Sequence, residues 1–201
     1  MNGFNKNINE QLKILEEIIY KNSKLMEVLK TLEEYAKTNP VFTNYYVGAG
    51  SINQTVFNYL SNKEIDYGIK DFDIVYFDKD LSYEAEDKII KELSKRLVNN
   101  GILFDIKNEA RVHIWYNEKY KTNRLPYTSV EDAIASWGTT VTCIGVRLEN
   151  DKLVTYCPYG LNDLFSMTIR PVKKNFTKKQ YEDRVSRWKK KWNNLNVISW
   201  D

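Results

Sequence analysis

Residues 70–77 read KDFDIVYF, two acids set among the kinds of residue that build β-strands. The second half of this segment is rich in β-branched and aromatic side chains, which favour strands. Along a strand alternate side chains point to one face, so Asp71 and Asp73 share a face, roughly 6.5–7 Å apart at their bases. Phe72 and Ile74 then face the core. The sequence therefore predicts a strand with one apolar face and two neighbouring carboxylates on the other.

The two carboxylates allow two interpretations. Like charges held close together repel, and a nearby cation relieves that repulsion. Hard divalent cations such as Mg²⁺ prefer oxygen ligands of this kind. A short Asp-x-Asp pattern also arises as two solvated acids on an edge strand. The flanking residues are needed to choose between a metal site and a solvated edge.

The residues before this segment supply a turn suited to an anion. Residues 45–47 predict a short strand that runs into Gly48-Ala49-Gly50-Ser51, and residues 52–60 predict a helix. Free backbone N–H groups and the helix dipole at such a helix start favour a bound phosphate, and glycine lets a ligand approach the backbone closely. Taken alone, the turn could equally be a tight connection between a strand and a helix.

A third carboxylate follows the segment. Residues 102–115 predict one long strand, whose alternation places five side chains on one face: Asp105, Lys107, Glu109, Arg111 and His113. An ionic row between apolar neighbours exceeds what a plain surface strand requires. Lys107 could act on a phosphate or simply pair with Glu109. We expect His113 to be a hydrogen-bonded structural residue.

Helix signals are clear in the first half of the chain. Apolar residues recur at helical spacing over residues 9–37, with a break near Asn22. Ser82 is placed to cap a further helix, which ends at Asn99-Asn100-Gly101. Strands therefore alternate with helices in this half of the chain, and predicted helices lie both before and after the strand that carries the acidic pair.

The second half of the chain changes to a hairpin. Residues 140–148 and 152–156, joined by a polar turn, predict its two strands. Residues 177–192 predict a final helix, because Thr177 with Gln180 has the spacing of a capping box. Strands alternating with helices, followed by a hairpin, indicate an α/β (α+β) fold with a mixed β-sheet and helices packed on it.

No convincing domain boundary interrupts the chain. Its 201 residues are 42% hydrophobic and 28% charged, an ordinary globular composition. We therefore expect a single domain over residues 1–201, with N-terminal helices over 1–40, a core over 41–170 and a basic helical segment over 171–201. From residue 170 onward ten Lys/Arg stand against three Asp/Glu. This surplus suits a polyphosphate or a nucleic-acid backbone, or simply a solvated helix face.

Composition also excludes several classes of protein. No stretch reaches the roughly 18 apolar residues of a membrane helix, and the N-terminus lacks the basic-then-apolar order of a signal peptide. A single histidine and 2 cysteines, with no CxxC motif, argue against a zinc site. Cys143 and Cys157 are expected to be small buried hydrophobes. A cytoplasmic location without membrane contact is the expectation.

The order of these segments resembles the DNA polymerase β-like nucleotidyltransferase superfamily. That order is a strand, a Gly-Ser turn, a helix, a strand with the Asp-x-Asp pair, a helix, and a strand with a third acid. Within the superfamily the chain is similar to a family of small bacterial nucleotidyltransferases. The segments that carry the resemblance are residues 48–52 with 55–56, 70–78, 105–115 and 158–165.

The resemblance implies the polymerase-β-like nucleotidyltransferase fold and an enzyme. Such an enzyme moves a nucleoside monophosphate from a nucleoside triphosphate to a hydroxyl or phosphate acceptor, which could be a small molecule, an RNA or a protein. Binding of Mg²⁺ or Mn²⁺ and catalysis would fall to three acids: Asp71, Asp73 and Asp105. Four further residues would contact the substrate: Gly50, Ser51, Lys107 and Arg111. The oligomeric state stays open.

Two positions depart from the family pattern. Asn53 stands where that family usually has Arg, and Glu109 stands where it usually has Gln. A missing cation beside the phosphate turn would weaken triphosphate binding. The alternative is therefore a catalytically inactive module that keeps the fold and binds RNA or a protein partner through its basic C-terminal segment.

Overall fold

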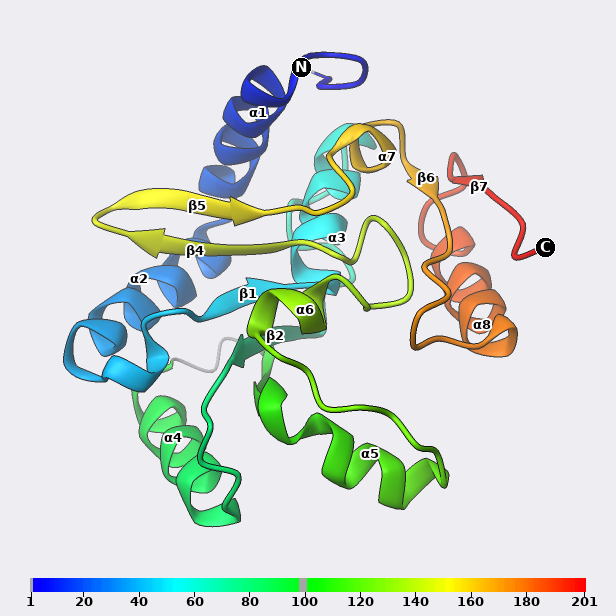
Figure 1. Cartoon of the computed structure of the whole chain (residues 1–201). Coiled ribbons are helices and arrows are strands. Elements are labelled where there is room, and N and C mark those ends of the chain that lie inside the picture. The colour runs from blue at the N-terminus through cyan, green and yellow to red at the C-terminus, as the bar shows by residue number, and fades with distance from the viewer. Residues whose placement is uncertain (1, 98–100) are drawn as a thin grey trace.

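A five-stranded mixed sheet forms the centre of the molecule, in the strand order β3-β2-β1-β4-β5 (Figure 1). The computed structural model describes residues 2–97 and 101–201. β2 and β3 run parallel, and the other neighbouring pairs run antiparallel, so the expected mixed sheet is confirmed. The strands are β1 (Tyr46–Gly48), β2 (Asp71–Tyr76), β3 (Leu103–Asn108), β4 (Gly145–Glu149) and β5 (Lys152–Tyr156).

Strand register brings the polar segments of the sequence together. In β1 and β2, Gly48 pairs with Asp73, so the glycine turn begins beside the acidic pair. In the parallel ladder, Asp73 lies opposite Asp105. Register partners in a sheet project to the same face, so these two acids lie on one face of the sheet.

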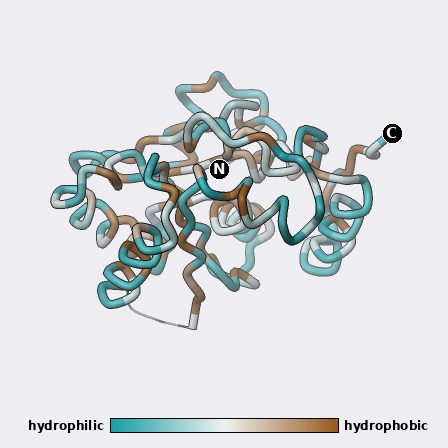
Figure 2. The backbone as a smooth tube through the Cα atoms, turned by 60° about the horizontal axis from the view of Figure 1, so that its bottom comes forward, coloured by the Kyte–Doolittle hydropathy of each residue, from teal (hydrophilic) through white to brown (hydrophobic). Residues whose placement is uncertain are grey.

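Four helices pack with one face of the sheet to form the main core: α1 (Ile8–Lys21), α2 (Ser23–Thr38), α3 (Gly50–Leu60) and α4 (Tyr83–Arg96). In Figure 2 hydrophilic and hydrophobic residues alternate along the outer helices, as expected for helices with one buried face. The predicted break at Asn22 is confirmed, because its side chain accepts the Leu25 N–H and caps α2. Ser82 caps α4 as predicted, whereas Asn99 and Asn100 lie outside the described residues.

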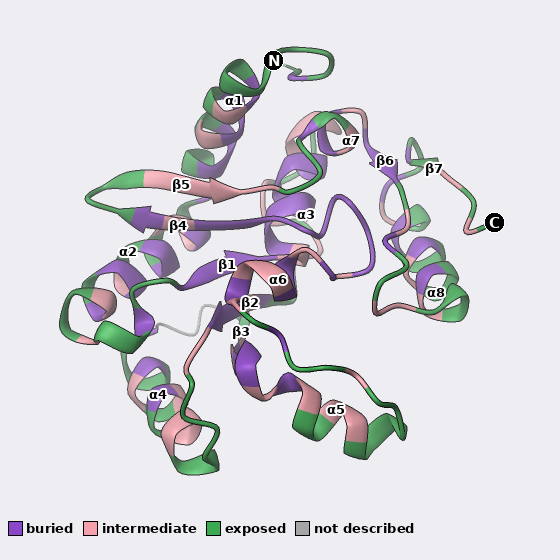
Figure 3. Cartoon of the chain, viewed as in Figure 1, coloured by how far each residue is buried: buried purple, intermediate pink, exposed green. Residues whose placement is uncertain are grey.

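The other face of the sheet is covered only in part. The short helix α6 (Val130–Ile134) packs its apolar residues against Tyr46 and Val75. Beside it the face continues toward Asp73 between two projecting helices, α5 (Val112–Tyr120) and α8 (Lys178–Lys189) (Figure 1). Figure 3 shows β1 buried and β4 mostly buried, whereas α5 after its first turn is half-buried or exposed.

The C-terminal segment docks on α3. The predicted capping box of Thr177 and Gln180 is confirmed, although α8 ends at Lys189. Trp192 is fully buried and packs edge-on against Phe57, with ring centroids 5.7 Å apart. Its indole N–H donates to Asn58 Oδ1 at 3.0 Å. Before α8 come α7 (Asn162–Phe165) and β6 (Thr168–Ile169), and after it β7 (Asn196–Val197) pairs in parallel with β6.

The prediction of one strand over residues 102–115 is wrong beyond Asn108. The Asn108 side chain accepts the N–H groups of Ala110 at 3.1 Å and of Asp78 at 2.9 Å, which turns the chain out of the sheet. A 3-10 turn η2 (Glu109–Arg111) and then α5 follow. Glu109, Arg111 and His113 therefore do not continue the ionic face of β3.

The first strand of the predicted hairpin also begins later than expected. Residues 139–143 form a turn in which the Cys143 N–H donates to the Thr139 carbonyl at 3.0 Å. β4 therefore starts at Gly145, and its pairing with β5 confirms the hairpin itself. Within the described ranges, no helix combines the length and apolar character needed to cross a membrane.

Candidate active site

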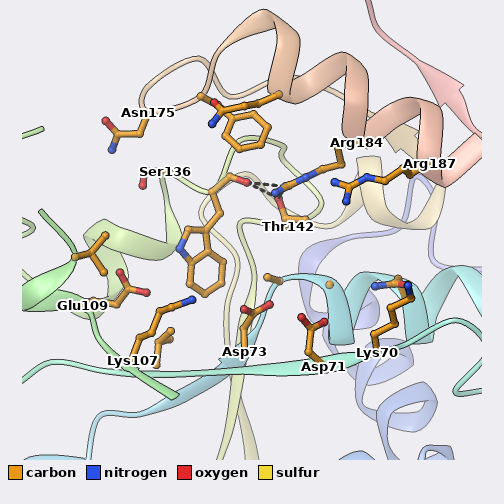
Figure 4. A pocket seen from close by; sticks show the side chains of 18 of the residues that line it. Lys70, Asp71, Asp73, Lys107, Glu109, Ser136, Thr142, Asn175, Arg184 and Arg187 are labelled. Carbon is orange, nitrogen blue, oxygen red and sulfur yellow. Dashed lines mark hydrogen bonds between the residues drawn. The ribbon is translucent and has the colours of Figure 1, made fainter. Parts of the chain in front are cut away.

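A cleft of about 770 Å³ opens on the uncovered part of the sheet. Asp71 and Asp73 of β2 form its floor together with the start of α3 at Gly50. Figure 4 shows Arg184 and Arg187 of α8 on the opposite wall, across from the two acids. The cleft is therefore bounded by carboxylates on one side and by guanidinium groups on the other.

Asp73 lies at the most enclosed point of the acidic floor. Burial raises the pKa of Asp73 to about 6, and repulsion from Asp71 and Asp105 acts in the same direction. Lys107 opposes the shift. A carboxylate in this position is stabilised in its charged form by any further cation placed beside it.

Asp105 is near the other two acids but is already partnered. Its carboxylate forms an ion pair with the Lys107 ammonium, and Lys107 rather than Asp105 lines the cleft. Although burial opposes it, this contact raises the pKa of Lys107 above its usual range. Within the described residues, His, Cys, Asp and Glu side chains form no group of three or more spaced to hold a metal ion.

The chemistry of Asp71 and Asp73 fits a divalent cation. The two side chains offer oxygen donors on one face of β2, and Figure 4 shows both carboxylates directed into the cleft. Burial is the main cause of the raised pKa of Asp73, so a cation bound beside it would stabilise its charged form. Asp105 could add a third oxygen donor only after leaving Lys107.

The glycine turn presents backbone to the cleft. Ala49 and Gly50 line it, and Ala49 adopts φ 50° and ψ −124°, a conformation that non-glycine residues rarely adopt. Ser51 is fully buried, and its hydroxyl donates to the Gly48 carbonyl at 2.8 Å. The Ala49 N–H already donates to the Ile144 carbonyl at 3.1 Å. An anion at this helix start would therefore meet the backbone of Gly50 first, not the Ser51 hydroxyl.

Glu109 occupies the inner end of the cleft. It is 4% exposed, and burial raises its pKa to about 8 against the opposing effect of Lys107. Figure 4 shows its carboxyl group beside the Lys107 ammonium group. The sequence placed Glu109 in the ionic row and marked it as a departure from the family pattern, and the structure places it in the cleft.

Sequence reasoning missed the aromatic part of the cleft. The Arg124 guanidinium lies 3.7 Å from the centre of the Tyr116 ring and donates to the Tyr127 hydroxyl at 3.2 Å and to the Asn175 carbonyl at 3.1 Å. Trp137 also lines this part. Flat rings beside fixed polar groups can hold a planar heterocycle. The sequence offered only the high number of aromatic residues as a signal.

Arg111 and His113 lie elsewhere. The Arg111 side chain pairs with Glu86 and donates to the Leu81 carbonyl at 2.9 Å, and Arg111 does not line the cleft. His113 belongs to α5, and its buried Nδ1 has no hydrogen-bond partner among the described residues. Of the seven sequence-predicted site residues, the cleft is lined by four: Gly50, Asp71, Asp73 and Lys107.

A strand bearing paired acids, preceded by a glycine turn that opens a helix and paired in parallel with a strand bearing a third acid, defines a polymerase-β-like nucleotidyltransferase. Comparison with known proteins agrees. Residues 38–197 match the model of a nucleotidyltransferase family, and the chain belongs to this family.

A solved structure shows the same fold. It is described as an NMR structure that reveals a CCA-adding enzyme head domain, and it superposes with a TM-score of 0.70 at 25% sequence identity. The match covers 92% of this chain and 95% of the other. A search of curated proteins found no match.

Proposed function

We propose that this protein is a metal-dependent enzyme that moves a nucleoside monophosphate from a nucleoside triphosphate to a hydroxyl or phosphate acceptor. The observation that carries the proposal is the placement of Asp71 and Asp73 side by side in an open cleft, next to the start of α3. Two carboxylates beside an anion-binding helix start can hold a metal and a triphosphate together.

Asp71 and Asp73 would hold Mg²⁺ or Mn²⁺. When bound, the metal supplies positive charge that stabilises the phosphate oxygens during the displacement. The other roles, orienting the triphosphate and excluding water, fall to residues of the chain. The backbone at Gly50 would orient the triphosphate, and the walls of the cleft would exclude bulk water from it.

Asp105 is the proposed acceptor of the proton. The oxygen of the acceptor attacks the α-phosphorus, the bond to the β-phosphate bridging oxygen breaks, and pyrophosphate leaves. The hydroxyl proton would pass to Asp105 once that carboxylate is released from Lys107. The freed Lys107 ammonium would then offset charge on the phosphates.

The acceptor is best sought first among RNA 3′ ends, because the similar solved structure is described as a CCA-adding enzyme head domain. The alternative, an inactive module that binds RNA or a protein, has one observation in its favour. Lys107 neutralises Asp105 in the structure, which leaves two acids rather than three for a metal.

The test is transfer of label from each α-³²P nucleoside triphosphate to a cell extract and to an RNA mixture, with Mg²⁺ or Mn²⁺. We expect a labelled product with the native chain and none with the double variant Asp71→Asn/Asp73→Asn. Asp87→Asn, on α4 outside the cleft, is the control and should keep activity. Retained transfer in the double variant would refute the proposal, and RNA binding without transfer in the native chain would favour the alternative.

A further inference from the structure

The wall opposite the acids carries a line of cations. Arg184, Arg187 and Lys191 follow one another at intervals of three and four residues, so they lie on one side of α8 and its C-terminal turn. All three line the cleft. Lys70, in the loop before β2, lines the same part of it. Figure 4 shows Arg184, Arg187 and Lys70 at this end of the cleft, near Asp71.

These cations form no ion pair among the described residues, although Asp73 attracts Arg184 and Asp71 attracts Lys191 from across the cleft. Within residues 2–97 and 101–201, no carboxylate forms an ion pair with Arg184, Arg187, Lys191 or Lys70. Burial, with repulsion from Arg187, lowers the pKa of Arg184 to about 10. Burial, with repulsion from Lys70 and Arg187, also lowers the pKa of Lys191. The cluster therefore holds like charges together at an energetic cost that a bound anion would offset.

Neutral partners fix two of the cations in place. The Arg184 guanidinium donates to the Trp137 carbonyl at 3.0 Å and to the Thr142 hydroxyl at 3.2 Å, and it lies 4.6 Å from the centre of the Phe176 ring. The Lys191 ammonium donates to the Gly68 carbonyl at 2.7 Å. Carbonyl and hydroxyl groups orient these side chains without neutralising them, so their charge stays available to a ligand.

The cluster is tied to the helix start that faces the acids. Lys191 Nζ also donates to Gln54 Oε1 at 3.3 Å, and Gln54 lies one turn after Gly50 on α3. The cations therefore lie next to the backbone groups at the start of α3 that would bind the triphosphate. They line the cleft, whereas Lys189 lines a separate groove on the other side of α8.

We propose that Arg184, Arg187 and Lys191, with Lys70, form the site for the β- and γ-phosphates of the donor, the pair that leaves as pyrophosphate. The inference rests on the proposed function and adds the C-terminal segment to the donor site. Two linked phosphates carry the charge and the several acceptor oxygens that two guanidinium and two ammonium groups require. An extended polyanion would instead need cations that continue onto the open surface.

The test measures binding of inorganic pyrophosphate by titration calorimetry. It is done with Mg²⁺ on the native chain, and without metal in the Asp71→Asn/Asp73→Asn background, where acidic repulsion is absent. Arg187→Gln is the main variant, because Arg187 is exposed and the structure shows it in no hydrogen bond or ion pair within the described residues. Lys189→Gln is the matched control on the other side of the helix.

We expect Arg187→Gln to weaken pyrophosphate binding about tenfold in both settings, as the loss of one charge-assisted contact predicts. Lys189→Gln should leave binding unchanged. Equal binding by Arg187→Gln and the native chain, or no binding by the native chain, would overturn the inference. So would loss of RNA oligonucleotide binding in Arg187→Gln with pyrophosphate binding intact.

The measurement separates this inference from the proposed function. The double Asn background cannot hold the metal and needs no acceptor, so pyrophosphate binding there does not depend on nucleotide transfer. If the native chain transfers no nucleotide and Arg187→Gln still weakens pyrophosphate binding, the anion site is supported and the proposed function is refuted. If the native chain transfers a nucleotide and Arg187→Gln binds pyrophosphate normally, the proposed function is supported and the anion site is refuted.

Discussion

Replacing Glu109 by Gln should make the folded protein more stable at neutral pH. The folded chain keeps the Glu109 proton up to a pKa of about 8, whereas the carboxyl group usually releases it at 4.5. The folded state therefore binds more protons than the unfolded state between these two values, and the free energy of unfolding falls as pH rises through this window. At about 1.4 kcal/mol per pKa unit, the loss reaches about 3 kcal/mol at pH 7.

A Gln side chain has nearly the same shape and no charge, so it should recover most of this loss, about 2–3 kcal/mol at pH 7. Below pH 4.5 both states of the native chain are protonated and the advantage should vanish. Urea denaturation followed by circular dichroism at pH 4 and pH 7 measures both values. Glu118→Gln, at an exposed position of α5, is the control and should change neither. A Glu109→Gln advantage of equal size at both pH values would refute the reasoning.

Three further outcomes follow from the structure. Asp73→Asn should abolish most of the rise in melting temperature that Mg²⁺ or Mn²⁺ produces, since it removes one of the two neighbouring carboxylates that would hold the metal. An unchanged rise in thermal melts would show that the metal binds elsewhere. Trp192→Phe should cost about 1–3 kcal/mol in urea denaturation, because it leaves the buried Asn58 Oδ1 without its donor; a stability equal to the native value would contradict this. Arg111→Gln should lower stability, because Glu86 is left 15% exposed without its cation, while the rate of nucleotide transfer per folded molecule should not change.

The parts of the fold that the sequence predicted well depend on local physics. The face shared by Asp71 and Asp73 follows from the two-residue period of a strand. Asn22 and Thr177 cap helices through hydrogen bonds to residues three positions away, which the sequence displays directly. The order of the predicted elements then carried the resemblance to the nucleotidyltransferases, and the comparisons confirm the family and the fold.

The failures depend on contacts between distant residues. Alternation of polar and apolar residues continues past Asn108, yet the Asn108 side chain binds the backbone at Asp78, thirty residues away, and the strand stops. The pattern that suggested one ionic face thus spans a strand, a turn and a helix. The position of Arg184 in the cleft could not be predicted for the same reason, because it depends on how α8 docks, which no local sequence pattern encodes.

The docking of α8 on α3 has a consequence for how the chain opens. Trp188 and Trp192 pack against Phe57, so the cationic wall is held in place by the same aromatic contact that anchors the C-terminal segment. Sub-global unfolding that undocks this segment would separate the two walls of the cleft. A ligand that spans both walls binds only the docked state, and it should therefore slow amide hydrogen exchange in residues 178–197. Occupancy of the cleft and the opening of the C-terminal segment are two measures of one equilibrium.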